Sequence, residues 1–527
     1  MKLTDIIKHG VSPEWEEKGY QLPEFDIQAV RAKTHAEPTW VHFGAGNIFR
    51  AFPAAVLNDA LNSGKYDRGV IVAESFDYEI IDKAYQPYDN LSLLVSLKST
   101  GDIEKKVIAS VTESLKADYQ FADWARLVEI FRNPSLQMIS FTITEKGYGV
   151  NPADLERGLK PILAMGKVAV LLYERFQAGQ LPLTVQSMDN CSHNGDKVKA
   201  GVLQYVQKWV EDGMVPAAFK DYVLDETKVT FPWAMIDKIT PRPHEKVQAM
   251  LAADGFEDNY TIQTEKHTFT APFVNAEETE YLVIEDNYTN GRPPLELGGV
   301  MYTTRETVDK VETMKVTTCL NPLHTAMSIY GCMLGYTLIS AEMADSDIRS
   351  FIQKLGYIEA MPVVTDPGVL NPYEFIGAVL NRRLPNPFMP DAPQRIAMDT
   401  SQKLAIRFGE TLKKYQARGL DKSNLVLIPL VLAGYARYLR GIDDFGNAFE
   451  PSPDPLLTQL QPMVAGLEVR EGEQDFSCLK KLYARTDVFG VDIYALGIGE
   501  QVEGMVKELY AGPGAVRRTL HKYVEAR

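Results

Sequence analysis

Cysteine is scarce in this chain and is not grouped. The 527 residues include 4 cysteines, which stand far apart at Cys191, Cys319, Cys332 and Cys478. No pair has the spacing of metal ligands. We therefore expect reduced thiols, a cytoplasmic protein and no bound metal ion.

The sequence also lacks a membrane-spanning run. Its most apolar long stretch, residues 319–343, contains Asn321, Pro322 and His324. Such a stretch is typical of a buried core helix rather than of a membrane span. Residues 1–8 are charged and have no apolar core, so we expect no signal peptide there. We expect no membrane partner.

Basic residues are fewer than acidic residues in this chain. Lys and Arg number 55 against 70 Asp and Glu, which gives a formal net charge of −15. This balance argues against non-specific nucleic-acid binding and against a basic membrane-binding face. It is compatible with an anionic small substrate, which needs only a local cluster of Arg and Lys. We expect a small-molecule substrate and no nucleic acid, and a monomer or small homo-oligomer.

Two types of periodicity divide the chain. With 527 residues it is too long for one core, so more than one domain is expected. Its first third alternates strand-like and helix-like stretches, which predicts a mostly parallel sheet with helices on both faces. The expected strands are 39–43, 69–73, 93–97, 136–144 and 181–185, with a second strand-rich patch over 260–286.

After the turn-rich segment Asn290–Pro294 the pattern becomes helical. The expected helical segments lie near 304–316, 322–342, 345–355, 371–382, 400–416, 423–440, 455–465 and 498–524. The sequence thus predicts an α/β domain with an expanded sheet over 1–295 and a mostly α-helical domain over 296–527.

A glycine-rich turn, within Val41–Arg50, follows the first expected strand. Gly44 permits a tight turn, and Gly46 lets the backbone approach a pyrophosphate. The usual third glycine is missing, because Arg50 lies one position past its place. A purely structural turn would use the same residues. The strand before and the helix after it favour a Rossmann-like dinucleotide site.

The second expected strand is followed by two acidic residues, Glu74 and Asp77. An acid at this place binds the adenosine ribose hydroxyls and repels the 2′-phosphate of NADP. Either residue would therefore favour NAD. The alternative for each is a solvated loop carboxylate.

The segment Lys315–His324 places an amine, an amide and an imidazole together. A lysine with a lowered pKa acts as a base, and Asn and His donate hydrogen bonds to an oxygen that gains negative charge. Asn321 and His324 share a helix face, and Pro322 makes Asn321 a natural N-cap. The alternative is a capped helix with a core histidine and a surface lysine.

Three other polar segments stand out. Ser187–Gly195 follows an expected strand, at the type of edge where ligands bind, although Asx-rich turns look similar. Asp237 lies inside an apolar stretch. Arg395 and Lys403 place two cations eight residues apart near a helix start.

In order along the chain, these segments resemble the polyol-specific long-chain dehydrogenase/reductase family. The resemblance spans about residues 40–520 and rests on Phe43–Arg50, Thr142–Tyr148, Met188–Asn190, Asn194–Gly195, Met235–Pro241, Val283–Asp286, Gly291–Pro293, Lys315–His324, Ala397–Lys403, Tyr438–Asp443 and Phe489–Asp492. An ordered series is far more specific than any single motif.

The resemblance implies catalytic roles. Lys315 matches the general base, and Asn190 and His324 match a pair that holds the substrate oxygen as an oxyanion. Asn321 matches a residue that positions substrate and lysine. Glu312 matches a carboxylate that gates proton exit.

Substrate contacts are implied as well. Asp237 matches a carboxylate of the substrate site, and Arg395 and Lys403 match nearby basic residues. Together with Arg382 and Arg383, these cations would hold a substrate carboxylate.

For the cofactor, Asp77 matches the NAD-selecting acid better than Glu74 does. The expected cofactor-binding residues are Gly44, Gly46, Asn47, Ile48, Arg50, Glu74, Asp77, Thr144 and Glu145, and the expected cofactor is NAD(H).

One spacing departs from the family pattern. The family has four residues between the lysine and the asparagine, whereas five separate Lys315 from Asn321. In an uninterrupted helix the extra residue would turn Lys315 about 100° away from the site. Either the backbone bulges by one residue to present Lys315, or the base lies elsewhere.

These observations predict an NAD-dependent oxidoreductase that interconverts a sugar acid or polyol and its keto form, with a lysine base and no metal. We favour D-fructuronate and D-mannonate as the substrate pair. Mannitol 2-dehydrogenase or tagaturonate reductase activity is an alternative, and so is a non-catalytic nucleotide-binding protein.

Overall fold

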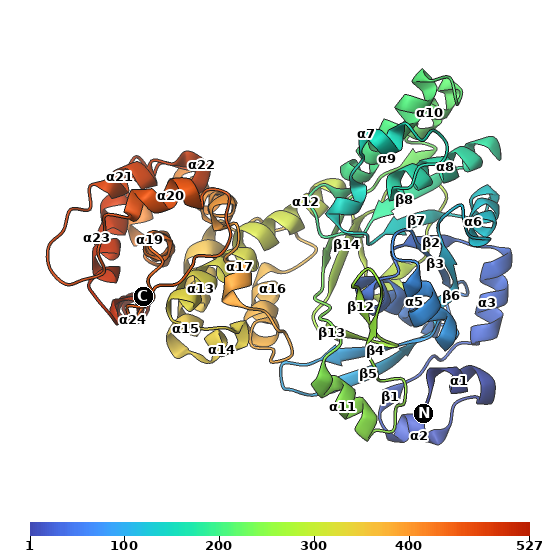
Figure 1. The fold of residues 1–527 in the computed structure, drawn as a ribbon, viewed down its shortest axis with the longest axis horizontal. Helices are drawn as coiled ribbons and strands as arrows, with labels where there is room; N and C mark the ends of the chain where they lie inside the picture. The colour runs from blue at the N-terminus through green and yellow to red at the C-terminus, as the bar shows by residue number, and fades with distance from the viewer. The chain divides into compact units, whose positions relative to one another are not determined.

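The computed structural model describes residues 1–527, which divide into two compact units. Unit 1 comprises Met1–Lys98 and Asp102–Asp309, and unit 2 comprises Ser99–Gly101 and Lys310–Arg527. Unit 1 contains the sheets, whereas unit 2 is built of helices (Figure 1).

Six parallel strands form the central sheet of unit 1. Their order is β6-β3-β2-β7-β8-β9, with bounds Val111–Lys116 (β6), Val70–Glu74 (β3), Trp40–Phe43 (β2), Met138–Phe141 (β7), Leu183–Ser187 (β8) and Val229–Thr230 (β9). Numbered along the chain, this is the 3-2-1-4-5-6 order of the Rossmann fold. The order reverses between β2 and β7, so the carboxyl ends of these two strands border the crevice where such sheets bind ligands.

The helices of unit 1 connect its strands, and several of them pack on this sheet. They are α1 (Leu3–His9), α2 (Pro13–Glu17), α3 (Ile27–Ala36), α4 (Asn47–Ala51), α5 (Pro53–Asn62), α6 (Asp123–Arg132), α7 (Pro152–Leu155), α8 (Ala164–Gln177), α9 (Asn194–Glu211), α10 (Ala217–Leu224) and α11 (Glu245–Ala253). The apolar faces of α6, α8, α9 and α10 form one buried core with Val41, Ile71 and Ile139 of the sheet.

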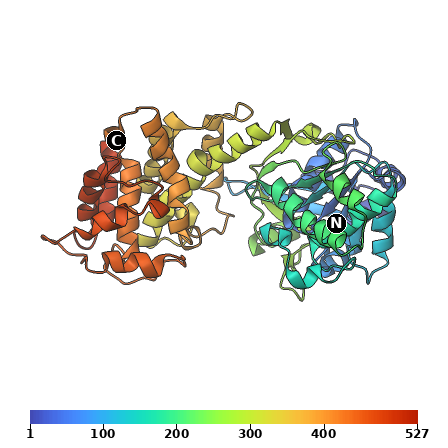
Figure 2. The ribbon, with the colours of Figure 1, turned by 90° about the horizontal axis from the view of Figure 1, so that it is seen from above.

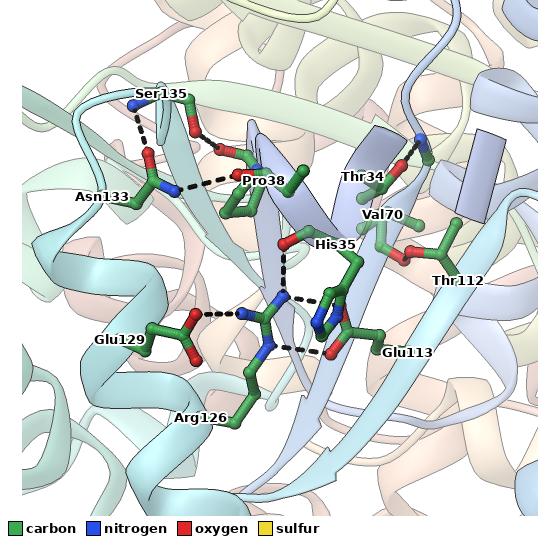
Figure 3. A network of polar contacts seen from close by, with 12 residues as sticks. Thr34, His35, Pro38, Val70, Thr112, Glu113, Arg126, Glu129, Asn133 and Ser135 are labelled. Carbon is green, nitrogen blue, oxygen red and sulfur yellow. Dashed lines mark hydrogen bonds and ion pairs between the residues drawn. The ribbon is translucent and has the colours of Figure 1, made fainter. Parts of the chain in front are cut away.

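Arg126 ties two helices to the sheet edge (Figure 3). It lies on α6, and its guanidinium donates to the Glu113 carboxylate of β6 at 3.0 and 2.8 Å. The same group donates to the His35 carbonyl at the end of α3 (2.8 Å). One guanidinium thus holds α3, α6 and β6 together through a paired charge.

The strand expected at 93–97 exists, but it belongs to a second sheet. β4 (Ser92–Leu97) forms an antiparallel hairpin with β5 (Ile103–Ile108), in a sheet of order β1-β5-β4-β13. The remaining strands are β1 (Tyr20–Gln21), β10 (Ala234–Asp237), β11 (Ile262–Gln263), β12 (Phe269–Thr270), β13 (Phe273–Glu277), β14 (Tyr281–Glu285) and β15 (Met301–Thr303). The assignment to the parallel sheet was wrong because β5, which pairs with β4 along its whole length, was not recognised.

Unit 2 is a bundle of helices (Figure 2), of which α13 and α19 are almost entirely buried. Its helices are α13 (Asn321–Met333), α14 (Ile339–Ala344), α15 (Ser346–Lys354), α16 (Pro372–Ala378), α17 (Pro393–Ile396), α18 (Glu410–Ala417), α19 (Leu427–Leu439), α20 (Leu457–Val464), α21 (Cys478–Tyr483), α22 (Thr486–Phe489), α23 (Gly499–Leu509) and α24 (Ala515–Ala526). α12 (Arg305–Met314) spans the boundary between the units. The fold-class prediction, a Rossmann-like domain followed by a mostly helical domain, is confirmed.

Two of the expected long helices are each divided. Residues 322–342 form α13 and α14, and the chain turns between them at Gly335, whose φ is 81°. Residues 498–524 form α23 and α24, separated by Gly512 and Gly514, both with positive φ. Glycine accepts this backbone conformation without strain and ends helices there. None of the helices has the length and apolarity needed to cross a bilayer.

Unit 2 also contains four π-helical turns, in which a backbone N–H donates a hydrogen bond to the carbonyl five residues earlier. They are η5 (Lys315–Cys319), η6 (Leu355–Ala360), η8 (Val379–Arg383) and η10 (Ala405–Gly409). η5 packs against both η6 and η10. π-turns are rare in proteins as a whole, but those that occur are often found at functional sites. This cluster of π-turns is therefore a candidate for a functional region.

Candidate active site

The glycine turn has the geometry that its residue types predict. Gly44 follows β2 with φ of 106°, and a Cβ there would lie 2.3 Å from the Thr142 carbonyl oxygen. Only glycine fits this approach to the strand at the other side of the crevice. At Gly46 an added Cβ would meet nothing within 4 Å. The turn therefore leaves open space above its backbone, as a pyrophosphate would require.

Asn47 and Arg50 lie on α4, the helix that follows the turn, and their side chains bind other parts of unit 1. The Arg50 side chain is buried, and it donates to the Ala271 carbonyl (2.7 Å) and the Asn47 amide oxygen (2.8 Å). The Asn47 amide donates to the Phe269 carbonyl (3.4 Å). Both residues anchor α4 to the β12–β13 segment, whereas Ile48 lines a cavity described below.

Glu74 and Asp77 are both buried at the end of β3. The Glu74 carboxylate accepts the backbone N–H groups of Ala45 and Phe76, each at 2.8 Å, and so fixes the glycine turn to the strand. One Asp77 oxygen accepts the Thr264 hydroxyl at 2.7 Å. Burial raises the pKa of Glu74, and these backbone bonds oppose that shift.

A cavity of about 240 Å³ opens beside the glycine turn in unit 1. Its lining residues are Ile48, Thr144, Glu145, Met188, Asp189, Asn190, Ile236 and Lys238. The structure thus brings together four residues predicted from sequence: Ile48, Thr144, Glu145 and Asn190. Asp237 is buried next to it, as the last residue of β10.

The backbone of Thr144 is strained. Its φ of 64° and ψ of 161° fall in a region that is almost exclusive to glycine. The Asp189 carboxylate holds the segment by accepting the N–H groups of Ile143 and Thr144, both at 2.9 Å, and the Tyr148 hydroxyl at 2.5 Å. Asp189 is therefore the clamp that keeps this strained turn against the cavity. Its place directly before Asn190 was the only sequence signal.

Replacing Asp189 by Asn is expected to loosen this turn. One carboxylate oxygen becomes an NH₂ group that faces a backbone donor, so at least one bond is lost at a cost of about 1–3 kcal/mol. We expect the KM for the predicted NAD(H) cofactor to rise about tenfold. Tyr148→Phe, which leaves both backbone bonds, serves as the control and should change KM little. A lower melting temperature with an unchanged KM would assign Asp189 to the fold alone.

In unit 2, Lys315 is the first residue of a π-turn. Its carbonyl accepts the N–H of Leu320 at 3.1 Å, five residues on. The Thr317 carbonyl accepts the Thr411 hydroxyl of α18 at 3.2 Å. A π-turn holds one residue more than an α-turn, so this turn accommodates the extra residue between Lys315 and Asn321. Lys315 is buried, with 5% of its surface exposed, and Glu312 lies one turn earlier on α12.

The π-turn also shifts the start of the next helix. Leu320, rather than Asn321, takes the N-cap position of α13, because its carbonyl accepts the first helical bond from the His324 N–H (3.1 Å). The prediction that Asn321 is the N-cap is wrong by one residue. Its side-chain amide therefore makes no capping bond and has no hydrogen-bond partner in the protein.

His324 is likewise without a hydrogen bond from the protein to its imidazole. Burial lowers its pKa to about 4, an effect that Asp391 opposes and that Arg383 and Arg407 reinforce. The ring is therefore neutral at pH 7 and keeps one N–H donor. A core histidine that only supported the fold would be expected to have a partner for its nitrogens.

The predicted cations have different surroundings. Arg395 forms a two-pronged ion pair with Asp391 at 2.6 and 2.5 Å. The Lys403 ammonium donates to the carbonyls of Ile396 (3.1 Å) and Met398. Arg383 is buried on η8.

Sequence reasoning missed Arg407. Its guanidinium donates to the Thr325 hydroxyl and to the Asn321 carbonyl (3.4 Å), on either side of His324. The available signal was a single Arg in the apolar run 404–409, four residues after Lys403.

No three His, Cys, Asp or Glu side chains form a metal-binding group in the chain, and all four cysteines are free thiols.

Comparisons with known proteins agree with this fold. Residues 38–297 match the Mannitol dehydrogenase Rossmann domain, and residues 307–510 match the Mannitol dehydrogenase C-terminal domain. D-mannonate oxidoreductase of Thermotoga maritima is 50% identical over 97% of each chain.

Two solved structures share the fold. A substrate-free D-sorbitol dehydrogenase aligns with TM-score 0.78 at 25% identity, over 96% of this chain and 97% of that one. Pseudomonas fluorescens mannitol 2-dehydrogenase, solved with NAD and D-mannitol, aligns with TM-score 0.68 at 23% identity over 100% of both chains. The chain belongs to the mannitol dehydrogenase family and is an oxidoreductase that acts on CH–OH groups.

Proposed function

We propose that this protein is an NAD-dependent oxidoreductase that interconverts D-fructuronate and D-mannonate. The observation that carries the chemistry is the pair of polar groups on the first turn of α13. The Asn321 amide and the His324 imidazole have no hydrogen-bond partner in the protein, and the π-turn that begins at buried Lys315 packs against the same helix. An amine and two neutral donors suit the proton transfer of alcohol oxidation.

In this proposal the side chains of unit 2 transfer the hydroxyl proton and bind the substrate oxygen. The Lys315 amine takes the hydroxyl proton of the alcohol and returns it to the ketone in the reverse direction. The neutral His324 ring donates a hydrogen bond to the oxygen as negative charge builds up on it. Asn321 orients the substrate, and Glu312, one turn before the lysine, passes the proton toward solvent. Bound NAD(H) supplies or accepts the hydride.

Unit 1 would hold the cofactor. The open space above Gly46 and the cavity lined by Ile48 and Thr144 fit a dinucleotide at the crevice of the sheet. Asn190, which lines the same cavity, is proposed to donate a hydrogen bond to the substrate. Asp77 supports a preference for NAD, since its carboxylate would repel a 2′-phosphate.

The choice of substrate rests on charge and on similarity. The curated relative with 50% identity is a D-mannonate oxidoreductase. Arg383, Arg395 and Arg407 all act on His324 electrostatically, with Asp391 as the opposing carboxylate. Such an excess of positive charge favours an anionic substrate over a neutral polyol.

A substrate panel tests the proposal. NADH consumption would be measured with D-fructuronate, D-tagaturonate and D-fructose, and repeated with NADPH. We expect kcat/KM to be highest for D-fructuronate with NADH, by about tenfold or more over each competitor, which corresponds to about 1.4 kcal/mol. A higher value for D-fructose or D-tagaturonate would indicate the corresponding polyol or altronate enzyme. NADH binding without turnover of any of the three would indicate a non-catalytic protein.

A further inference from the structure

Arg407 is fixed at the start of the helix that carries His324. It lies in the π-turn η10, which packs against η5 and α13. Its Nη1 group donates to the Thr325 hydroxyl and to the Asn321 carbonyl. These two residues flank His324 on the first turn of α13, so the guanidinium lies beside the proposed reaction centre.

No carboxylate of the protein neutralises Arg407. Its hydrogen-bond partners are a hydroxyl and a carbonyl, and it forms no ion pair. Burial lowers the pKa of this group to about 10, although it stays charged at neutral pH. By contrast, Arg395 in the same cluster is paired with Asp391. Withdrawing a cation from water without an anion is costly, which points to a negative group that arrives with the ligand.

The Nε–Nη2 edge of the Arg407 guanidinium remains free to bind a ligand. Nη1 is engaged, whereas Nε and Nη2 have no acceptor in the protein and are not among its buried unsatisfied atoms. These two groups point their N–H bonds in parallel, the arrangement that binds both oxygens of one carboxylate. A single hydroxyl would use one of them and would leave the charge uncompensated.

We propose that Arg407 binds the carboxylate of the hexuronate through its Nε–Nη2 edge and thereby selects sugar acids over ketoses and polyols. This inference rests on the proposed function, since it assigns one group of that substrate. The Nη1 bonds to the first turn of α13 would fix the distance between the bound carboxylate and His324. Arg407 is then both the specificity residue and a support of the catalytic helix.

The test compares acid and neutral substrates in Arg407 variants. For Arg407→Gln we expect kcat/KM for D-fructuronate to fall about 100-fold, the loss of a charged two-pronged bond. Any turnover of D-fructose should fall much less than 100-fold, because a neutral ketose loses only the support that Arg407 gives to the first turn of α13 and no carboxylate bond. Arg407→Lys keeps the positive charge but cannot form the two-pronged bond. Its kcat/KM for D-fructuronate should lie between the values of the wild type and of Arg407→Gln. Arg418→Gln is the matched control, because it removes one charge from the C-cap of α18, where Arg418 is exposed and bonds only the Pro362 carbonyl (3.0 Å).

Binding provides a second readout that does not need turnover. D-mannonate should raise the melting temperature of the wild type more than D-mannitol at equal concentration, since ligands stabilise the state they bind. In Arg407→Lys this difference should shrink. If Arg407→Gln does not fold, this comparison in wild type and Arg407→Lys decides the question.

The outcomes separate the two proposals. A wild-type protein that does not reduce D-fructuronate overturns the proposed function. A wild type that reduces D-fructuronate, with Arg407→Gln equally active on it, overturns only the carboxylate site. Equal stabilisation of the wild type by D-mannonate and D-mannitol would also overturn the carboxylate site and leave the proposed function standing.

Discussion

Replacing Lys315 by Ala is expected to lower kcat by about 10³-fold or more, within the range that general base catalysis contributes. The variant loses the amine proposed to accept the hydroxyl proton, while the Rossmann unit that would bind the cofactor is unchanged. The NADH dissociation constant should therefore stay near the wild-type value. Steady-state kinetics with D-fructuronate, together with NADH binding by fluorescence titration, measures both quantities.

Two controls make this result specific to the amine. Lys413→Ala removes an exposed lysine of α18 that pairs with Glu410, and it should leave kcat unchanged. Added methylamine should restore part of the activity of Lys315→Ala, because a small amine fits the space left by the side chain. Near-wild-type turnover of Lys315→Ala would show that the base lies elsewhere.

The second large effect is expected at His324. His324→Ala removes the neutral donor proposed to bind the reacting oxygen, and the loss of such a donor costs about 10²–10³-fold in kcat. His324→Gln, which keeps an N–H donor without a titrating ring, should recover part of that loss. Equal kcat in wild type and His324→Ala would contradict the assigned role.

The low pKa of His324 also predicts a pH dependence of stability. The folded pKa is about 4 and the ordinary value is 6.5, so the unfolded chain binds a proton between these values and the folded protein does not. The free energy of unfolding should therefore fall as pH drops from 6.5 toward 4. Urea unfolding at pH 7 and pH 5 should show a smaller fall for His324→Gln than for wild type. An identical fall would mean that His324 titrates normally in the folded protein.

Local features of the site were predictable from sequence. Gly44 and Gly46 were recognised because a tight turn and an open backbone need glycine whatever the rest of the chain does. The strands on either side follow from short apolar runs, and the helical second domain follows from its periodicity. Such signals lie within about ten residues of each other, so a single sequence displays them.

Long-range partners were not predictable in the same way. Arg50 lies in the glycine-turn motif, yet its guanidinium bonds Thr270 and Ala271, more than 200 residues away. Arg407 was overlooked because its partner Thr325 lies on another helix, 82 residues earlier in the chain. The π-turn at Lys315 uses residues that an α-helix accepts equally well, so only the backbone bond to Leu320 distinguishes the two.

The π-turn at Lys315 has a consequence for how such sites diverge. A helix that can widen by one residue tolerates a single-codon insertion next to a proposed catalytic side chain, because the extra length is taken up locally. Fixed spacing is then a poor criterion for recognising relatives. A search pattern that demands four residues between lysine and asparagine would discard this chain, whereas one that allows four or five would retain it.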